Sequence, residues 1–320
     1  SLKRISFQGT FPSVTHIGSS FLRSCRALES LDFSGDAFGE VSVIDDNFAQ
    51  FCTGLKSVNL AGAFPRVLLV QEHFLYRATS LTSINLDGAF RTVEYIPSDF
   101  LGALWSLKRI VFPASAFMKV ERISDAFLFS NGALSEVIFE PESFPSVHSI
   151  GNFFIGSNDR LTRVNFKRSF QKVTVIGDNF LVSATAGTPS NSSSKHVFNF
   201  CDAFPEVVRV GSYFMGNATG LTELNFSNAF QNVVCVKSKF LCSCTNLRRV
   251  DMSLSFLKLT ASPAAVGTEF LNHCRNSLRV VRVCILNEDA VRCAVKRTFC
   301  FGDDVEEKFF VKGGGPADTG

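Results

Sequence analysis

The sequence predicts a repeat solenoid built from about ten coils of 26–27 residues. The pattern is clearest in Leu81–Phe100, LTSINLDGAFRTVEYIPSDF, and it recurs with drift at Leu28–Phe48 and Leu221–Phe240. A fixed period of this length is typical of stacked repeats, in which each unit covers the apolar face of its neighbour. The opening position of the repeat falls at Leu2, Leu28, Leu55, Leu81, Leu107, Leu134, Leu161, Lys195, Leu221, Leu247 and Leu278.

Two apolar columns predict a parallel sheet on one face of the solenoid. The third and fifth positions after the opener, Ile84 and Leu86 in the clearest copy, are apolar in all ten units. In a chain that is 46 % hydrophobic, chance would fill one such column about four times in ten thousand. The alternation points Ile84 and Leu86 inward and Asn85 outward, so we expect a short strand in every unit. Identical strands in successive units should pair in parallel.

Two columns consist of phenylalanine alone. The first holds Phe11, Phe38, Phe64, Phe90, Phe117, Phe144, Phe170, Phe204, Phe230 and Phe256, and the second holds Phe21, Phe48, Phe74, Phe100, Phe127, Phe154, Phe180, Phe214, Phe240 and Phe270. Phenylalanine buries a large area without needing a hydrogen bond, which suits a dry stacked core. Between the two columns, segments such as Val41–Ile44 and Val173–Ile176 predict a second, shorter extended run.

The remainder of each coil is expected to return the chain to the next strand. Glycines that follow the shorter run in several copies suit a turn; they are Gly18, Gly151, Gly177, Gly211 and Gly267. In Ser19–Ala27, Phe21 and Cys25 are four residues apart, which places them on one face of a short helix or helical turn.

These segments resemble leucine-rich repeats, and more narrowly the BspA-like type found in surface proteins of bacteria and protists. The match lies in Ile17-Gly18-Ser19-Ser20-Phe21 followed by Cys25-Arg26-Ala27-Leu28. The resemblance implies a right-handed, horseshoe-like α/β solenoid, with the parallel sheet on its concave face and a use in adhesion or recognition. It brings no catalytic residues. This chain departs from that type in three ways: its units are longer, it has an extra Phe column, and only four coils keep the return cysteine.

Three segments are predicted along the chain. Residues 1–285 form the solenoid, residues 286–311 an atypical C-terminal cap, and residues 312–320 a disordered tail. We expect a helix over Asn287–Thr298 with Asn287 as its N-cap. Ser183–Lys195 predicts an exposed loop, either a tolerated insertion or a segment for binding or cleavage. Because Ser1 falls in mid-repeat, the chain is expected to be a fragment or a processed product.

The ten cysteines allow more than one interpretation. Cys25, Cys52, Cys244 and Cys274 occupy the inward return column, as small buried hydrophobes or as pairs formed between coils. Cys242 and Cys244 alone make a weak metal motif. Cys284, Cys293 and Cys300 lie beyond the last regular strand and would be oxidised in an exported cap.

Composition argues against several classes of function. A net charge of +3 and a pI near 8.3 are too mild to indicate a nucleic-acid partner. No apolar run reaches the length of a membrane span. The five histidines sit at different repeat positions, and no nucleophile or phosphate-loop motif is present. We therefore expect a protein that is not an enzyme and that needs no cofactor or metal.

One outward column of the strands points to a candidate surface. Its members are Ser6, Asp32, Asn59, Asn85, Val111, Ile138, Asn165, Asn199, Asn225 and Asp251. Asn and Asp are depleted in strands, so their repetition predicts either a hydrogen-bonded ladder between coils or a polar binding surface. The column turns apolar at Val111 and Ile138, within a ring of charge, as in a protein-binding patch. The candidate partner-binding residues are Arg109, Val111, Pro113, Glu136, Ile138, Glu140, Arg163 and Asn165.

These patterns leave three functional hypotheses. The first is a recognition or adhesion module that binds a protein or glycan through the concave sheet. The second is a structural or self-associating surface rod, and the third is an intracellular arm that selects substrates for a larger assembly. The sequence favours the cell surface or secretion, but the compartment, the ligand and the oligomeric state stay open.

Overall fold

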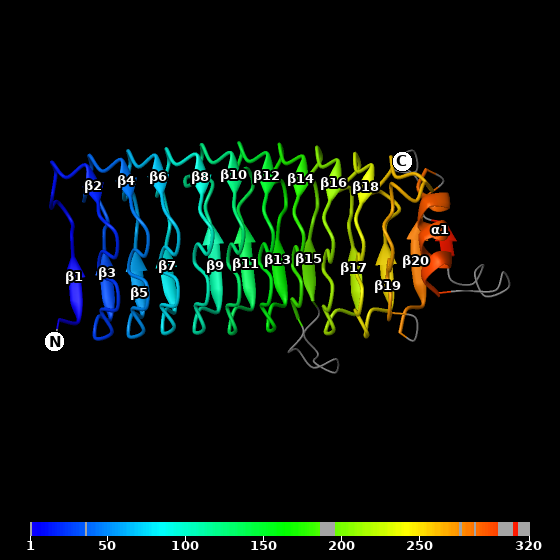
Figure 1. The fold of residues 1–320 in the computed structure, drawn as a ribbon, viewed down its shortest axis with the longest axis horizontal. Coiled ribbons are helices and arrows are strands. Elements are labelled where there is room, and N and C mark those ends of the chain that lie inside the picture. The colour runs from blue at the N-terminus through cyan, green and yellow to red at the C-terminus, as the bar shows by residue number, and fades with distance from the viewer. Residues whose placement is uncertain are drawn as a thin grey trace.

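The chain folds into a rod of stacked coils in which almost all regular structure is β-strand (Figure 1). A computed structural model describes residues 2–35, 37–185, 196–274, 277–284, 286–299 and 310–312. The expected loop at Ser183–Lys195 and the expected tail lie mostly outside these residues. In the view of Figure 1 the coils stand in a nearly straight row. We call the sheet formed by their long strands the main sheet.

Each coil contributes one long strand, as the apolar alternation predicts. The long strands are β1 (Arg4–Ser6), β3 (Ser30–Asp32), β5 (Ser57–Asn59), β7 (Ser83–Asn85), β9 (Arg109–Phe112), β11 (Glu136–Phe139), β13 (Arg163–Asn165), β15 (Val197–Asn199), β17 (Glu223–Asn225), β19 (Arg249–Asp251) and β20 (Val280–Val283). Neighbours pair in parallel and in the predicted register, for example Val137 with Ile110 and Val164. The ladder is interrupted twice, between β7 and β9 and between β15 and β17.

The predicted second run is a two-residue strand. These short strands are β2 (His16–Ile17), β4 (Val43–Ile44), β6 (Leu69–Val70), β8 (Tyr95–Ile96), β10 (Arg122–Ile123), β12 (Ser149–Ile150), β14 (Val175–Ile176), β16 (Arg209–Val210) and β18 (Cys235–Val236). They form a second parallel row that breaks between β6 and β8. Pro97 explains this break. In the coils before and after it, the residue at the same repeat position, Gln71 or Ser124, donates its backbone N–H to the preceding coil. Proline has no N–H and cannot make this hydrogen bond.

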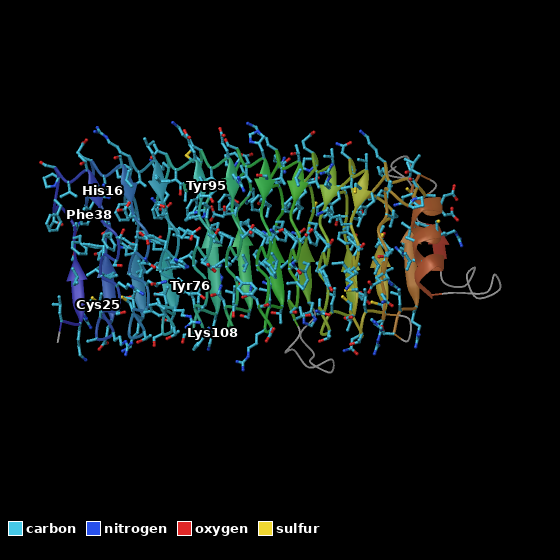
Figure 2. The ribbon with its side chains drawn as sticks, viewed as in Figure 1. His16, Cys25, Phe38, Tyr76, Tyr95 and Lys108 are labelled. Atoms are coloured by element: carbon cyan, nitrogen blue, oxygen red, sulfur yellow. The ribbon has the colours of Figure 1, made fainter. Side chains whose placement is uncertain are left out.

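The core between the two rows consists of stacked phenylalanines (Figure 2). Ring centroids of successive members lie 5.2–6.1 Å apart in the first column. In the second column they lie 4.7–6.2 Å apart. Rings of the two columns meet edge to face, as Phe90 does with Phe74. Both geometries are favourable for aromatic pairs.

The backbone of the first Phe column is unusual. All ten residues have φ between 53° and 59°, the left-handed region that bulky residues rarely adopt. The carbonyl of each accepts a hydrogen bond three residues later, as from Val41 to Phe38 at 3.1 Å. The ring stacking therefore holds the chain in a tight turn that its backbone preference alone disfavours.

The return arc is a ribbon of turns in place of the helical turn expected there. Three alternate residues in each coil have positive φ, as Asn47, Ala49 and Phe51 do. The N–H groups of Asn47 and Phe51 donate to the following coil, at Glu72 and Tyr76. Ala49 donates to Phe21 of the preceding coil. Phe48, Ala49 and Cys52 are all buried, so the ribbon satisfies the same spacing of apolar residues, at positions i, i+1 and i+4, as a helix would.

The return column of cysteines is a hydrogen-bonding position. The Sγ of Cys52 donates to the Leu22 carbonyl at 3.0 Å and accepts the N–H of Cys25. Asn131 makes the same two contacts through Nδ2 to the Leu101 carbonyl and Oδ1 from the Leu104 N–H. All nine cysteines of the described segments are free thiols, so the structure contains buried thiols and no pairing between these coils.

Four of the five glycines after the short strands, all except Gly18, allow a close approach between coils. A Cβ on Gly211 would lie 2.2 Å from the Gly177 carbonyl oxygen, and one on Gly177 would lie 2.6 Å from Gly151. The expected turn, or a bend in the case of Gly267, follows directly after each of these glycines, and none of the five needs a positive φ for it. At Gly18, in the first coil, a Cβ would meet nothing within 4 Å.

The C-terminal end carries the predicted helix, α1 (Glu288–Phe299), and a last strand, β21 (Phe310–Lys312), paired with β20. Asn287 is buried, and its Oδ1 accepts the N–H of Cys284. Its Nδ2 donates to the Met252 and Ser255 carbonyls, so this side chain fastens α1 to the last coil. The boundary placed at residue 285 stays a prediction. No helix within the described segments is both long and apolar enough to cross a membrane.

Candidate functional site

The polar column of the main sheet closes a turn at the end of each strand. The side-chain oxygen of every Asn and Asp in the column accepts the backbone N–H two residues later, at 2.6–3.3 Å. Such turns are a common role for these residue types. The N–H of Ser34 also lowers the pKa of Asp32. The predicted ladder between coils is present at two pairs, Asn59 with Asp32 at 3.1 Å and Asn199 with Asn165 at 2.9 Å.

The column lacks this turn at Val111 and Ile138. Strands that end at a polar member are three residues long, whereas β9 and β11 continue for a fourth residue. The position two residues after Val111 is Pro113, which has no N–H to offer. Val111 and Ile138 are register partners, and both side chains are half-buried. Two coils therefore present a continuous apolar strip where the others present an amide, a carboxylate or a hydroxyl group.

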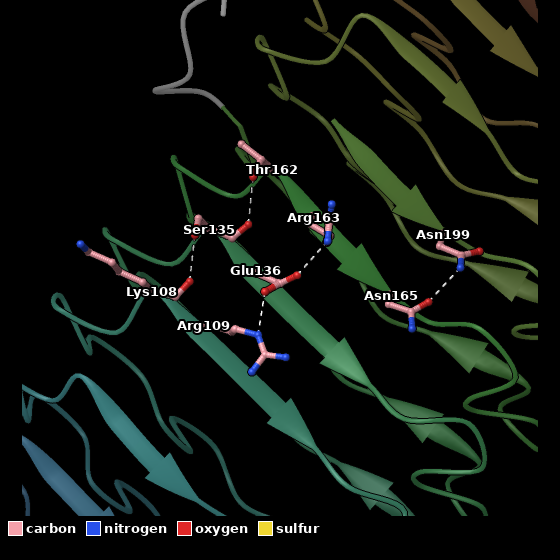
Figure 3. A network of polar contacts seen from close by, with 8 residues as sticks. All are labelled: Lys108, Arg109, Ser135, Glu136, Thr162, Arg163, Asn165 and Asn199. Atoms are coloured by element: carbon pink, nitrogen blue, oxygen red, sulfur yellow. Dashed lines mark hydrogen bonds and ion pairs between the residues drawn. The ribbon is translucent and has the colours of Figure 1, made fainter. Parts of the chain in front are cut away.

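An ion-pair row runs beside this strip (Figure 3). Glu136 accepts from Arg109 Nε at 2.7 Å and from Arg163 Nη1 at 3.3 Å. The three residues occupy one register position on β9, β11 and β13. The arginine side chains are 57 % and 59 % exposed, so the pairs contribute little stability and leave guanidinium edges free to contact a partner.

Hydroxyl groups complete the network at the start of these strands. Ser135 Oγ donates to the Lys108 carbonyl at 3.0 Å, and Thr162 Oγ1 donates to the Ser135 carbonyl at 3.2 Å. Figure 2 places Lys108 and Cys25 at the end of the coils where long strands begin, and His16 and Tyr95 at the short-strand end.

A surface hollow of about 560 Å³ adjoins the apolar strip at the interruption between β7 and β9. Its lining includes Val111, Pro113 and Glu140 from the predicted site, together with Ile84 and Asp87 from the preceding coil. Glu140 accepts the N–H of Ala114 at 3.1 Å, which holds this carboxylate over the rim. Across the hollow, Ser115 Oγ donates to Asp87 Oδ1 at 2.6 Å.

The structure thus places all eight predicted site residues on three adjoining strands or, for Pro113 and Glu140, directly after them. Arg109, Glu136 and Arg163 meet directly, and Asn165 continues the column beside Ile138. Sequence reasoning missed Ile84, Asp87 and Ser115, because nothing in the repeat pattern shows where the ladder opens. Two further hollows, of about 420 and 370 Å³, lie at the other two interruptions. Within the described segments no cluster of side chains suits a metal ion.

The fold and this site define a parallel β-solenoid of the leucine-rich repeat class, whose exposed strands offer a surface for recognition. The family model described as BspA type leucine rich repeat region, in six copies, matches residues 1–96 and 70–202. The chain belongs to that family. A comparison with curated proteins finds no match.

A solved structure is also similar in part. A leucine-rich repeat protein from Bacteroides ovatus ATCC 8483 shares 16 % identity over 98 % of this chain and 84 % of its own, with a TM-score of 0.36. Leucine-rich repeats are generally non-enzymatic, and membership of this family supports a repeat-based module for protein interaction or recognition.

Proposed function

We propose that the protein recognises a protein partner through the strip formed by Val111 and Ile138, with the hollow beside it and the ion-pair row above it. The observation that carries this proposal is the replacement of the polar column by two in-register apolar residues. Apolar centres with a polar rim are typical of protein interfaces. The setting would be adhesion or recognition at a cell surface or after secretion.

Rigidity supports this function. Every coil is tied to both neighbours by backbone hydrogen bonds and by the ring stacks, so the strip is presented in one geometry. A preformed surface loses little conformational entropy on binding, which favours affinity for a given contact area.

The test is a selection from a displayed peptide library on the native protein, followed by binding measurements on two variants. Val111→Asp places a charge in the strip, and Ser6→Asp places the same charge at the same repeat position in the first coil, away from the strip. Asp at position 6 keeps an oxygen acceptor for the Gln8 N–H. Selected peptides should lose at least about tenfold in affinity, or about 1.4 kcal/mol, on Val111→Asp and little on the control. Equal binding to both variants would place recognition elsewhere.

Thermal unfolding separates binding from folding. The melting temperature of Val111→Asp should stay close to that of the native protein, because the side chain is only half-buried. A large drop would mean that Val111 serves the core and that the strip is not a free surface.

A further inference from the structure

A second charged surface lies at the C-terminal end of the main sheet. Arg248, Arg249, Arg279 and Arg282 are all exposed on and beside β19 and β20. Arg248 and Arg279 occupy the same repeat position in neighbouring coils, since the N–H of Arg279 donates to the Arg248 carbonyl at 2.8 Å. Side chains so placed on neighbouring parallel strands are separated by about 5 Å at their base.

Elsewhere on this sheet a carboxylate separates basic residues of one column. Glu29 lies between Lys3 and Lys56, at 2.7 and 2.8 Å, and Glu136 lies between Arg109 and Arg163. No carboxylate stands between Arg248 and Arg279. Like charges at paired positions are unfavourable, so this pair is an exception that the fold itself does not require.

Glu223 is the register partner of Arg249, so the least compensated charges of the cluster are those of Arg248 and Arg279. Arg282 pairs with Asp251 at 3.4 Å, and Arg279 donates only to the carbonyl of Leu278. Among the residues that the structure describes, the side chains of Arg248 and Arg249 have no hydrogen bond or ion pair. Their guanidinium groups are therefore available for a ligand that carries oxyanions.

A hollow of about 420 Å³ adjoins this cluster at the interruption between β15 and β17. Its rim carries Arg249 and Arg282 together with the carboxylates of Glu223 and Asp251. Phe198 and Leu224, whose side chains are buried, form its apolar floor. A charged rim over an apolar floor suits a peptide that combines acidic and aliphatic side chains better than it suits a uniformly polar glycan.

From this arrangement we propose that Arg248, Arg249, Arg279 and Arg282 form a second binding site, for an acidic peptide segment of a protein partner. Its carboxylates would bind the arginines, and an aliphatic side chain would enter the hollow. The site is independent of the strip at Val111 and Ile138, whose nearer strand, β11, lies four strands from β19.

Fluorescence anisotropy with a labelled glutamate-rich peptide containing one leucine tests this proposal. The double variant Arg248→Gln/Arg279→Gln should weaken binding at least about tenfold. The matched control is Lys3→Gln/Lys56→Gln, which removes two charges from the same repeat position and should change affinity less than about twofold. The same peptide with glutamine for each glutamate should not bind.

Several outcomes would overturn the proposal. Equal weakening in both double variants would show attraction by net charge alone, and absence of binding to the native protein would remove the site. Tighter binding of a sulfated oligosaccharide of matched charge, lost in Arg248→Gln/Arg279→Gln, would assign the arginines to a glycan. The melting temperature of that double variant should hold or rise, because a repulsion is removed; a fall of several degrees would assign them to stability.

Discussion

Asn158 Oδ1 accepts the backbone N–H of Asn131 at 2.8 Å in the interior of the rod, where both side chains are fully buried. Asn158 Nδ2 donates to the Leu128 and Ile155 carbonyls as well. One side chain therefore satisfies three backbone groups of the return arc. Cysteine at the same position in four other coils supplies one donor and one weak acceptor, whereas Ala78, Leu104, Ala184 and Ala218 at this position supply neither.

The Asn158→Ala variant is expected to lose about 2–4 kcal/mol of unfolding free energy, because it leaves buried backbone N–H and C=O groups without a hydrogen-bond partner. Asn158→Cys should lose clearly less, since a thiol can donate to Leu128 and accept from Asn131 as Cys52 does with Leu22 and Cys25. Urea unfolding followed by circular dichroism would compare the two. Equal losses would show that the column needs only volume.

The Gly211→Ala variant should be destabilised by about 3 kcal/mol or fail to fold, because its methyl group would press on the backbone of the preceding coil. Gly18→Ala is the matched control at the same repeat position, where the space is open, and should unfold close to native. Thermal unfolding of both variants would decide. A native-like Gly211→Ala would mean that the coils can separate at little cost.

Replacement of Phe90 tests both its packing and its backbone conformation. Phe90→Ala should cost about 3–5 kcal/mol, because the ring is fully buried and stacks on Phe64 and Phe117. Since φ is 54° at this position, Phe90→Gly should be more stable than Phe90→Ala by about 1 kcal/mol, the reverse of the usual order in regular structure. Chemical denaturation of the pair measures the difference. The usual order would contradict a left-handed backbone here.

Asp32 should make folding sensitive to acid. Its pKa is lowered from 3.8, chiefly by the Ser34 N–H, so its contribution to stability is complete above the unfolded-state pKa. The contribution is lost as the pH falls through the lower pKa of the folded state. Asp32→Asn keeps the acceptor and does not titrate, so its unfolding free energy should fall less steeply below about pH 4. Parallel slopes for variant and native protein would contradict this role.

Thiol reactivity should divide the cysteines by burial. Burial raises the pKa of Cys52 to about 12 and that of Cys242 to about 11, so both should resist a thiol reagent near neutral pH. Cys201 and Cys235, which are partly exposed, should react in the native protein. Denaturation without reductant should make the remaining thiols reactive. Thiols that appear only after reduction would show that a pair had been oxidised, and would favour export.

The strands, the inward columns and the two Phe stacks followed from periodicity, because each depends on whether a position is apolar. Conformation of the return arc did not, since Phe21 and Cys25 fit a helical turn and an alternating ribbon equally well. The Asn and Asp column was expected either to join coils or to form a polar binding surface, yet its dominant contact is a local turn within one coil, as where Asn85 accepts the N–H of Asp87. The interruption of the main sheet between β7 and β9, beside Val111, depends on backbone hydrogen bonding. The pattern of side chains in the sequence does not predict it.

The interval between β9 and β19 spans five strand-to-strand steps, which at about 4.8 Å each amounts to roughly 24 Å. Because ring stacks and backbone bonds repeat in every coil, the rod acts as a ruler. The rod would fix the distance between the apolar strip and the arginine cluster. Loss or gain of one whole coil between them would change the spacing by one step while leaving each surface intact. A partner that contacts both surfaces would therefore bind only when the number of coils between them gives the right distance.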